Sequence, residues 1–236
     1  MNRQPTATLF ITTKDDTNSL IKGTTKLNRD AASFAPLGTG NRGKATTKMK
    51  TITEKEQDTI LNGVNVTKLG QTIEAVKQQP KLAEFKFRAH NRWERGAHTV
   101  ATIADFYGTC QELQHKAPFQ LAADEHPVLL GDDHGPGAGE YVLAALSACL
   151  TGTLAYHASA CGLKIEDIQS EYEGDVDLRG FLDIDPKVRN GFSEIRVKFK
   201  VKGNADEATV RQLLSKSPIY DTLANPVKIK IDVEMV

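Results

Sequence analysis

Cysteine has the most reactive side chain in this chain, and the sequence holds three: Cys110, Cys149 and Cys161. Cys149 and Cys161 share the most apolar long stretch, residues 135–163. If that stretch is one continuous helix, the two thiols lie about 18 Å apart at ~1.5 Å per residue. A disulfide needs Cα atoms within roughly 7 Å, so Cys161 cannot pair with Cys149 inside one chain. Cys110 falls in a loop after a predicted strand, where we expect an unpaired thiol.

Two interpretations of Cys149 follow from its surroundings. A free cysteine among leucines is commonly an inert core residue. The alternative is a reactive thiolate, which needs a positive charge nearby. The helix dipole does not supply that charge, because Cys149 lies roughly nine residues into the helix and the dipole effect fades within the first turn. A working thiol would therefore need a cation from elsewhere in the fold. The surrounding leucines, at helical spacing, are Leu143, Leu146, Leu150 and Leu154.

Other motifs that suggest chemistry are incomplete. The glycine-rich segment 135–139 precedes a predicted helix, but no Gly-Lys-Ser/Thr follows it as a phosphate-binding loop requires. Asp132, Asp133 and His134 are adjacent in a loop, and three adjacent residues rarely converge on one metal ion. His157 would lie about 12 Å along the helix from Cys149, and we interpret it as a core residue. We expect no metal and no cofactor.

The charge of the chain is unevenly distributed. Lys and Arg number 30, Asp and Glu also 30, so the net charge is zero. This balance argues against nucleic acid or an anionic membrane as a partner. Residues 1–50 nevertheless hold nine basic residues against three acids, and their composition predicts a disordered basic tail. Alternatives are an organelle transit peptide, against which the three acids count, or a native start at Met49.

Cysteine usage and hydropathy indicate a compartment. An odd, sparse cysteine count argues against a disulfide framework and for a reducing environment, so we expect a cytoplasmic protein. The N-terminus has no continuous apolar segment typical of a secretory signal. The apolar stretch 141–161 is interrupted by polar residues, and we interpret it as a core helix rather than a membrane span.

The hydrophobic periodicity predicts the order α-βββ-α-ββ-α-β, an α+β fold with an antiparallel sheet against the long helix. A stripe of Arg196, Lys198, Lys200 and Lys202 on one strand face should be solvated. The predicted elements are a helix over 65–79, strands over 83–93, 97–108 and 117–124, a long helix over 140–161, strands over 168–176 and 193–203, a helix over 204–218 and a last strand over 225–236.

Three segments in this order resemble the OsmC/Ohr family: "EYVLAALSACL", "GLKIEDIQSEYEGDVDLRG" and "SPIYDTLANPVKIKIDV". The resemblance runs from about Ala83 to Val236, and the preceding residues 51–82 resemble the helical extension of a longer subgroup. It implies an intertwined homodimer in which two long central helices pack together inside antiparallel sheets. A second copy would then cover a helix that is apolar on nearly every side.

The resemblance also implies a function. Characterised members reduce organic hydroperoxides and hydrogen peroxide with two cysteines, and Cys149 matches the cysteine that attacks the peroxide. Arg95 is the best match to the arginine that holds the thiolate, with Arg92 a poorer candidate. The resolving cysteine is replaced by Ser217. The catalytic glutamate position holds Gly139, and Glu140 stands one place later, where it serves as a candidate helix cap and partner of Arg95.

Two hypotheses follow. In the first, Cys149 is the single cysteine of a peroxidase, Arg95 stabilises its thiolate, Ser217 hydrogen-bonds the oxidised sulfur, and an external thiol is the reductant. In the second, the chain is a non-catalytic dimer that binds a small apolar ligand between subunits. The replacements at Ser217 and Gly139 favour the second.

Overall fold

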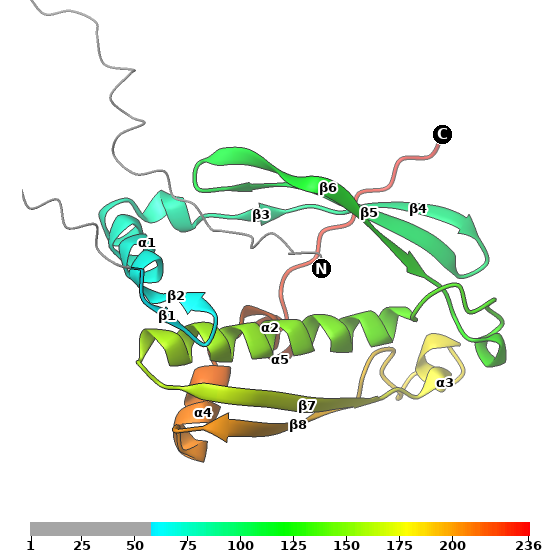
Figure 1. The fold of residues 1–236 in the computed structure, drawn as a ribbon. Coiled ribbons are helices and arrows are strands. Elements are labelled where there is room, and N and C mark those ends of the chain that lie inside the picture. The colour runs from blue at the N-terminus through cyan, green and yellow to red at the C-terminus, as the bar shows by residue number, and fades with distance from the viewer. Residues whose placement is uncertain (1–57) are drawn as a thin grey trace, which may run out of the picture. The chain divides into compact units, whose positions relative to one another are not determined.

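The computed structural model describes residues 58–236. The predictions for the tail 1–50 and for the start of the helical extension lie outside the described residues. The described part is a mixture of helices and antiparallel sheets, as the hydrophobic pattern predicted (Figure 1).

A short hairpin and a helix open the described part. The hairpin pairs β1 (Ile60–Leu61) with β2 (Val64–Asn65). The Asn65 side chain then caps α1 (Val66–Gln78) by accepting a hydrogen bond from Lys68 N at 2.9 Å. Pro80 begins a short 3-10 helix, η2 (Pro80–Ala83). The helix predicted over 65–79 is thus confirmed, because a side-chain cap starts it and proline cannot continue it.

The first sheet contains β3 (Lys86–Phe87), β4 (His90–Arg95), β5 (His98–Gly108) and β6 (Gln111–Ala123), with β5 pairing the other three antiparallel. The single strand predicted over 83–93 is wrong in detail, since it is divided between β3 and β4. The third strand starts six residues earlier than 117, because a tight turn at Thr109 and Cys110, both at positive φ, lets β6 pair with β5 at once.

The long helix α2 (Ala138–Ala160) confirms the predicted helix and begins two residues earlier. Gly162 follows its end at φ 71°, a conformation that glycine adopts without strain. By length and composition α2 is apolar enough to cross a membrane, with a mean hydropathy of 1.3 over 18 residues. The expectation that its polar residues exclude this was wrong. Its contacts are nevertheless those of a core helix, because it packs on α1, α4, α5 and β7.

The second sheet pairs β7 (Ile165–Asp175) with β8 (Glu194–Gly203), and α2 lies lengthwise over it (Figure 1). The core lies between α2, this sheet and α4 (Glu207–Leu214). Its buried members are Leu154, Ala158, Val210 and Leu213, and around them pack Leu163, Ile165, Ile168, Val201, Ala205 and Leu214.

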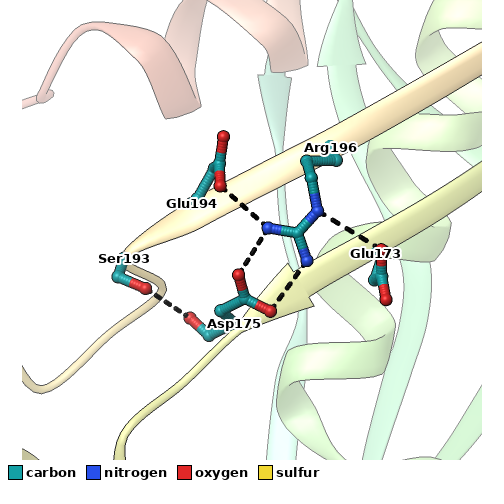
Figure 2. Close-up of polar contacts among 5 residues, drawn as sticks. All are labelled: Glu173, Asp175, Ser193, Glu194 and Arg196. Atoms are coloured by element: carbon teal, nitrogen blue, oxygen red, sulfur yellow. Dashed lines mark hydrogen bonds and ion pairs between the residues drawn. The ribbon is translucent and has the colours of Figure 1, made fainter.

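The other face of the second sheet is charged, as predicted for the basic stripe. Arg196 on β8 binds Glu173 and Asp175 on β7 and Glu194 beside it (Figure 2). Lys202 pairs with Glu166 at 2.9 Å. These contacts with Asp175 first, then Glu194, raise the pKa of Arg196 further above its ordinary value. The stripe is therefore an exposed ion-pair ladder across two strands.

Two predictions at the C-terminal end were wrong. The helix predicted over 204–218 stops at Leu214, and a separate helix, α5 (Pro218–Ala224), follows. The last predicted strand, 225–236, is not a strand within the described residues, because no neighbouring strand pairs with it. Its alternate apolar side chains stay exposed, with Ile229 at 77% and Ile231 at 81%. A short helix, α3 (Leu178–Phe181), lies in the connection between β7 and β8.

Candidate functional site

The structure brings Cys149 and Ser217 together. Ser217 Oγ donates a hydrogen bond to Cys149 Sγ at 3.1 Å. Ser217 is 0% exposed, and Tyr220 N donates to the same hydroxyl oxygen at 3.2 Å. Because that oxygen already accepts from Tyr220, its own proton is free to be donated to the sulfur. The arrangement favours a negative charge on Cys149, since a donor that bonds the charged form stabilises it.

The pair depends on two helices that sequence reasoning did not both identify. Cys149 lies on the α2 face that packs against α5. Ser217 is the N-cap of α5 and Pro218 is its first residue. Serine before proline is a helix-start signal, and this signal in the sequence predicts α5. We had instead extended the preceding helix through it.

Arg95 and Glu140 lie away from this pair. Arg95 forms an ion pair with Asp132 at 2.8 Å, and its side chain is 68% exposed. Glu140 accepts a hydrogen bond from Gly137 N at 2.7 Å and caps α2, the role expected for it. The expected Arg95–Glu140 contact is not seen, because Asp132 takes the guanidinium. Among residues 58–236, no hydrogen bond or ion pair joins Arg95 or Glu140 to Cys149. Arg92, the poorer candidate, pairs with Glu94.

The loop between β6 and α2 contains a buried carboxylate that sequence reasoning missed. Asp124 is 3% exposed. Its oxygens accept from the backbone N–H groups of Glu125, Asp132 and His134, and from His134 Nδ1 at 2.8 Å. The His134 contact, followed by the three amides, holds the pKa of Asp124 well below its usual range. Asp124 therefore organises the loop that carries Asp132.

The same loop was tested as a metal site. Ligand atoms of Asp124, Asp132 and His134 lie within 4.8 Å of one another. Both Asp124 oxygens already accept hydrogen bonds, and Asp132 binds Arg95. A metal ion would have to break these bonds, so the residues present do not fit one.

The position of Gly139 has a steric explanation. A Cβ on Gly139 would lie 3.2 Å from the Phe192 ring, and one on Gly174 would lie 2.5 Å from it. The ring therefore occupies a slot between the first turn of α2 and the end of β7. A side chain at 139, where the resemblance expects glutamate, would have to displace Phe192.

Two hollows border these residues. One, of about 490 Å³, lies at the start of α2 and is lined by His134, Glu140 and Tyr141 among others. The second, of about 610 Å³, lies between α2, β8 and α4, and its lining includes Leu150, next to Cys149, and Tyr220, next to Ser217's bonding partner. The second hollow thus opens beside the thiol–hydroxyl pair.

Comparisons with known proteins agree with this description. Residues 131–232 match the family model described as OsmC-like protein. A crystal structure of an OsmC-like protein from Mycoplasma pneumoniae is 17% identical, with 60% of this chain and 89% of that one covered and a TM-score of 0.45. An OsmC-like protein of unknown function from Vibrio cholerae is 11% identical, with coverages of 58% and 92% and a TM-score of 0.44.

A third structure, from Legionella pneumophila, is described as an organic hydroperoxide resistance protein, OsmC. It is 13% identical, with 61% of this chain and 94% of that one covered and a TM-score of 0.39. No curated protein matches the sequence.

The described residues define an α+β protein in which a long apolar helix places a cysteine against a buried hydroxyl. With its match over residues 131–232, the chain belongs to the OsmC family.

Proposed function

We propose that this protein acts in the stress response by reducing organic hydroperoxides or hydrogen peroxide with one cysteine, Cys149. The observation that carries the proposal is the 3.1 Å hydrogen bond from the buried Ser217 hydroxyl to Cys149 Sγ. A cysteine kept only as a small core side chain needs no such donor. A nucleophilic thiolate gains from one, because the bond stabilises its charge.

The chemistry balances without a second cysteine. The Cys149 thiolate attacks the distal peroxide oxygen, the O–O bond breaks, and the alkoxide or hydroxide takes a proton from solvent. Cys149 is then a sulfenic acid. An external thiol forms a mixed disulfide with it and releases water, and a second thiol frees Cys149 as an external disulfide forms. Ser217 cannot form a disulfide, so it holds the oxidised sulfur while the reductant arrives. Small thiols are abundant in the cytoplasm, where we place the protein.

We further propose that the working form is an intertwined homodimer. α2 is apolar on nearly every side, yet only 17% of its most apolar window is buried within the protomer. The first sheet also exposes a face of linked aromatic rings, on which Phe87 is 79% and Phe119 57% exposed. A second copy would cover both surfaces, and the unpaired segment 226–236 would gain a strand to pair with. Arg95 keeps its predicted role as the cation only if the dimer brings it to a Cys149.

The alternative is a non-catalytic dimer that binds a small apolar ligand. The hollow of about 610 Å³ beside Leu150 favours it, because Val197, Phe199 and Val201 line that space. This alternative has no use for a polarised sulfur.

The two functions are separated by turnover with an external thiol. Reduced protein is mixed with an organic hydroperoxide and a small dithiol, and peroxide consumption is followed alongside the Cys149→Ser and Cys161→Ser variants. We expect turnover to be lost in Cys149→Ser and retained in Cys161→Ser, whose thiol is exposed. Equal peroxide consumption by wild type and Cys149→Ser would refute the proposal.

A further inference from the structure

Two histidines face each other where the first sheet meets the loop before α2. His98, the first residue of β5, stacks on His134 with ring centroids 4.7 Å apart and planes at 12°. His134 Nδ1 lies 2.8 Å from the buried Asp124 carboxylate. We call His98, His134 and Asp124 the histidine latch. Beside it, the Arg95–Asp132 ion pair joins the same two segments.

The first proton that the latch takes up is well accommodated. The pKa of Asp124 is held well below its usual range, so this carboxylate is ionised near neutral pH and only accepts hydrogen bonds. His134 Nδ1 must therefore carry the proton of their shared bond, and Nε2 is the nitrogen that titrates. A proton on Nε2 gives an imidazolium directly paired with Asp124.

A second proton, on His98, has no such compensation. Among the described residues, His98 has no hydrogen bond or ion pair to a carboxylate. Its register partner on β4 is Arg95, another cation. The nearby acids are engaged elsewhere, Asp124 with His134 and Asp132 with Arg95. Two protonated rings would face each other at stacking distance, and like charges so placed repel strongly.

We propose that the histidine latch is a pH-sensitive device that opens under mildly acidic conditions and frees the loop 124–137 from the β4–β5 turn. The closed latch holds one proton where two separated imidazoles hold two. Below the ordinary histidine pKa of about 6.5, each pH unit therefore favours the open form by up to about tenfold. The loop leads into α2, lines the hollow at its start, and carries the Asp132 that holds Arg95. The inference does not depend on peroxide chemistry at Cys149.

Hydrogen exchange of the full-length protein tests the latch. The backbone N–H groups of Asp132 and His134 donate to Asp124, so their protection factors report whether the loop is fastened. We expect protection, corrected for the intrinsic rate, to fall about tenfold between pH 6.5 and 5.5. The His98→Phe variant keeps an aromatic ring without a titrating group, and its protection should stay constant over this range. His90→Phe, on the exposed start of β4, should behave as wild type.

Two results would overturn the proposal. One is a wild-type protection factor that is unchanged between pH 6.5 and 5.5. The other is a His98→Phe variant that loses protection to the same extent as wild type, since the loss would then come from another group.

Discussion

The hydroxyl of Ser217 stands where a two-cysteine peroxidase would need a thiol, and its 3.1 Å distance to Cys149 Sγ makes the substitution informative. A disulfide requires the two sulfurs at about 2.05 Å, so a thiol at 217 has to move by only about 1 Å to bond. We predict that Ser217→Cys forms a disulfide with Cys149 after one equivalent of hydroperoxide. Peptide mapping under non-reducing conditions detects it.

The matched control is Ser215→Cys, whose parent hydroxyl bonds the carbonyl of Gln212 and not the sulfur. It should form no link to Cys149. Absence of the 149–217 disulfide in an oxidised, folded Ser217→Cys protein would contradict the geometry of the pair.

Asp124 sets a dependence of stability on pH. Its pKa is lowered in the folded protein, chiefly by His134 and then by three backbone amides. A carboxyl with a lowered folded pKa stabilises the fold above its unfolded value of about 3.9 and loses that contribution as pH falls through the folded value. We therefore expect the urea midpoint of wild type to fall between pH 5 and pH 3 more steeply than that of Asp124→Asn.

Asp133→Asn is the control for this measurement. Asp133 lies in the same loop, is exposed, and has φ 60°, which asparagine tolerates. It should keep the wild-type pH dependence. If Asp124→Asn also keeps that dependence, another carboxyl causes the acid sensitivity.

At the scale of elements, Phe192 joins the first turn of α2 to the end of β7 through two glycines. A Cβ on Gly174 would lie 2.5 Å from the ring, whereas one on Gly152, within α2, meets nothing within 4 Å. We predict that Gly174→Ala lowers the free energy of unfolding by about 1–3 kcal/mol through overpacking. Gly152→Ala should raise it by up to about 1 kcal/mol through helix propensity. Urea unfolding measures both, and a neutral Gly174→Ala would show that the slot is loose.

The elements also show how far the sequence predicts this structure. α1, α2 and β8 followed from local signals: a cap with a proline stop, an apolar run ended by glycine, and strict alternation. Alternation also predicted a strand over 225–236, but pairing is not local, and no strand lies beside this segment within the described residues. At the site, Cys149 and Ser217 were named from the sequence. The Asp132 contact that holds Arg95 was not, because it depends on how Asp124 folds the loop.

At the scale of the whole molecule, the exposed apolar surfaces predict self-association. Phe119 lies on the aromatic face of the first sheet and is 57% exposed, and the next residue, Gln120, points to the opposite face. We expect Phe119→Glu to shift the protein towards monomer in analytical ultracentrifugation, because the charge would be buried in the interface. Gln120→Glu should leave the assembly unchanged. A wild type that is monomeric at micromolar concentration would contradict the proposed dimer.

The central claim is that Cys149 is a working thiol, and its oxidation is the most direct test. Reduced protein is treated with one equivalent of an organic hydroperoxide in the presence of a sulfenic-acid trapping reagent, and intact mass and peptide mapping locate the adduct. We predict one adduct, at Cys149, formed within seconds, while the exposed thiols of Cys110 and Cys161 stay reduced. A Cys149 that remains reduced at large peroxide excess would contradict the account and leave this cysteine a core residue of a binding protein.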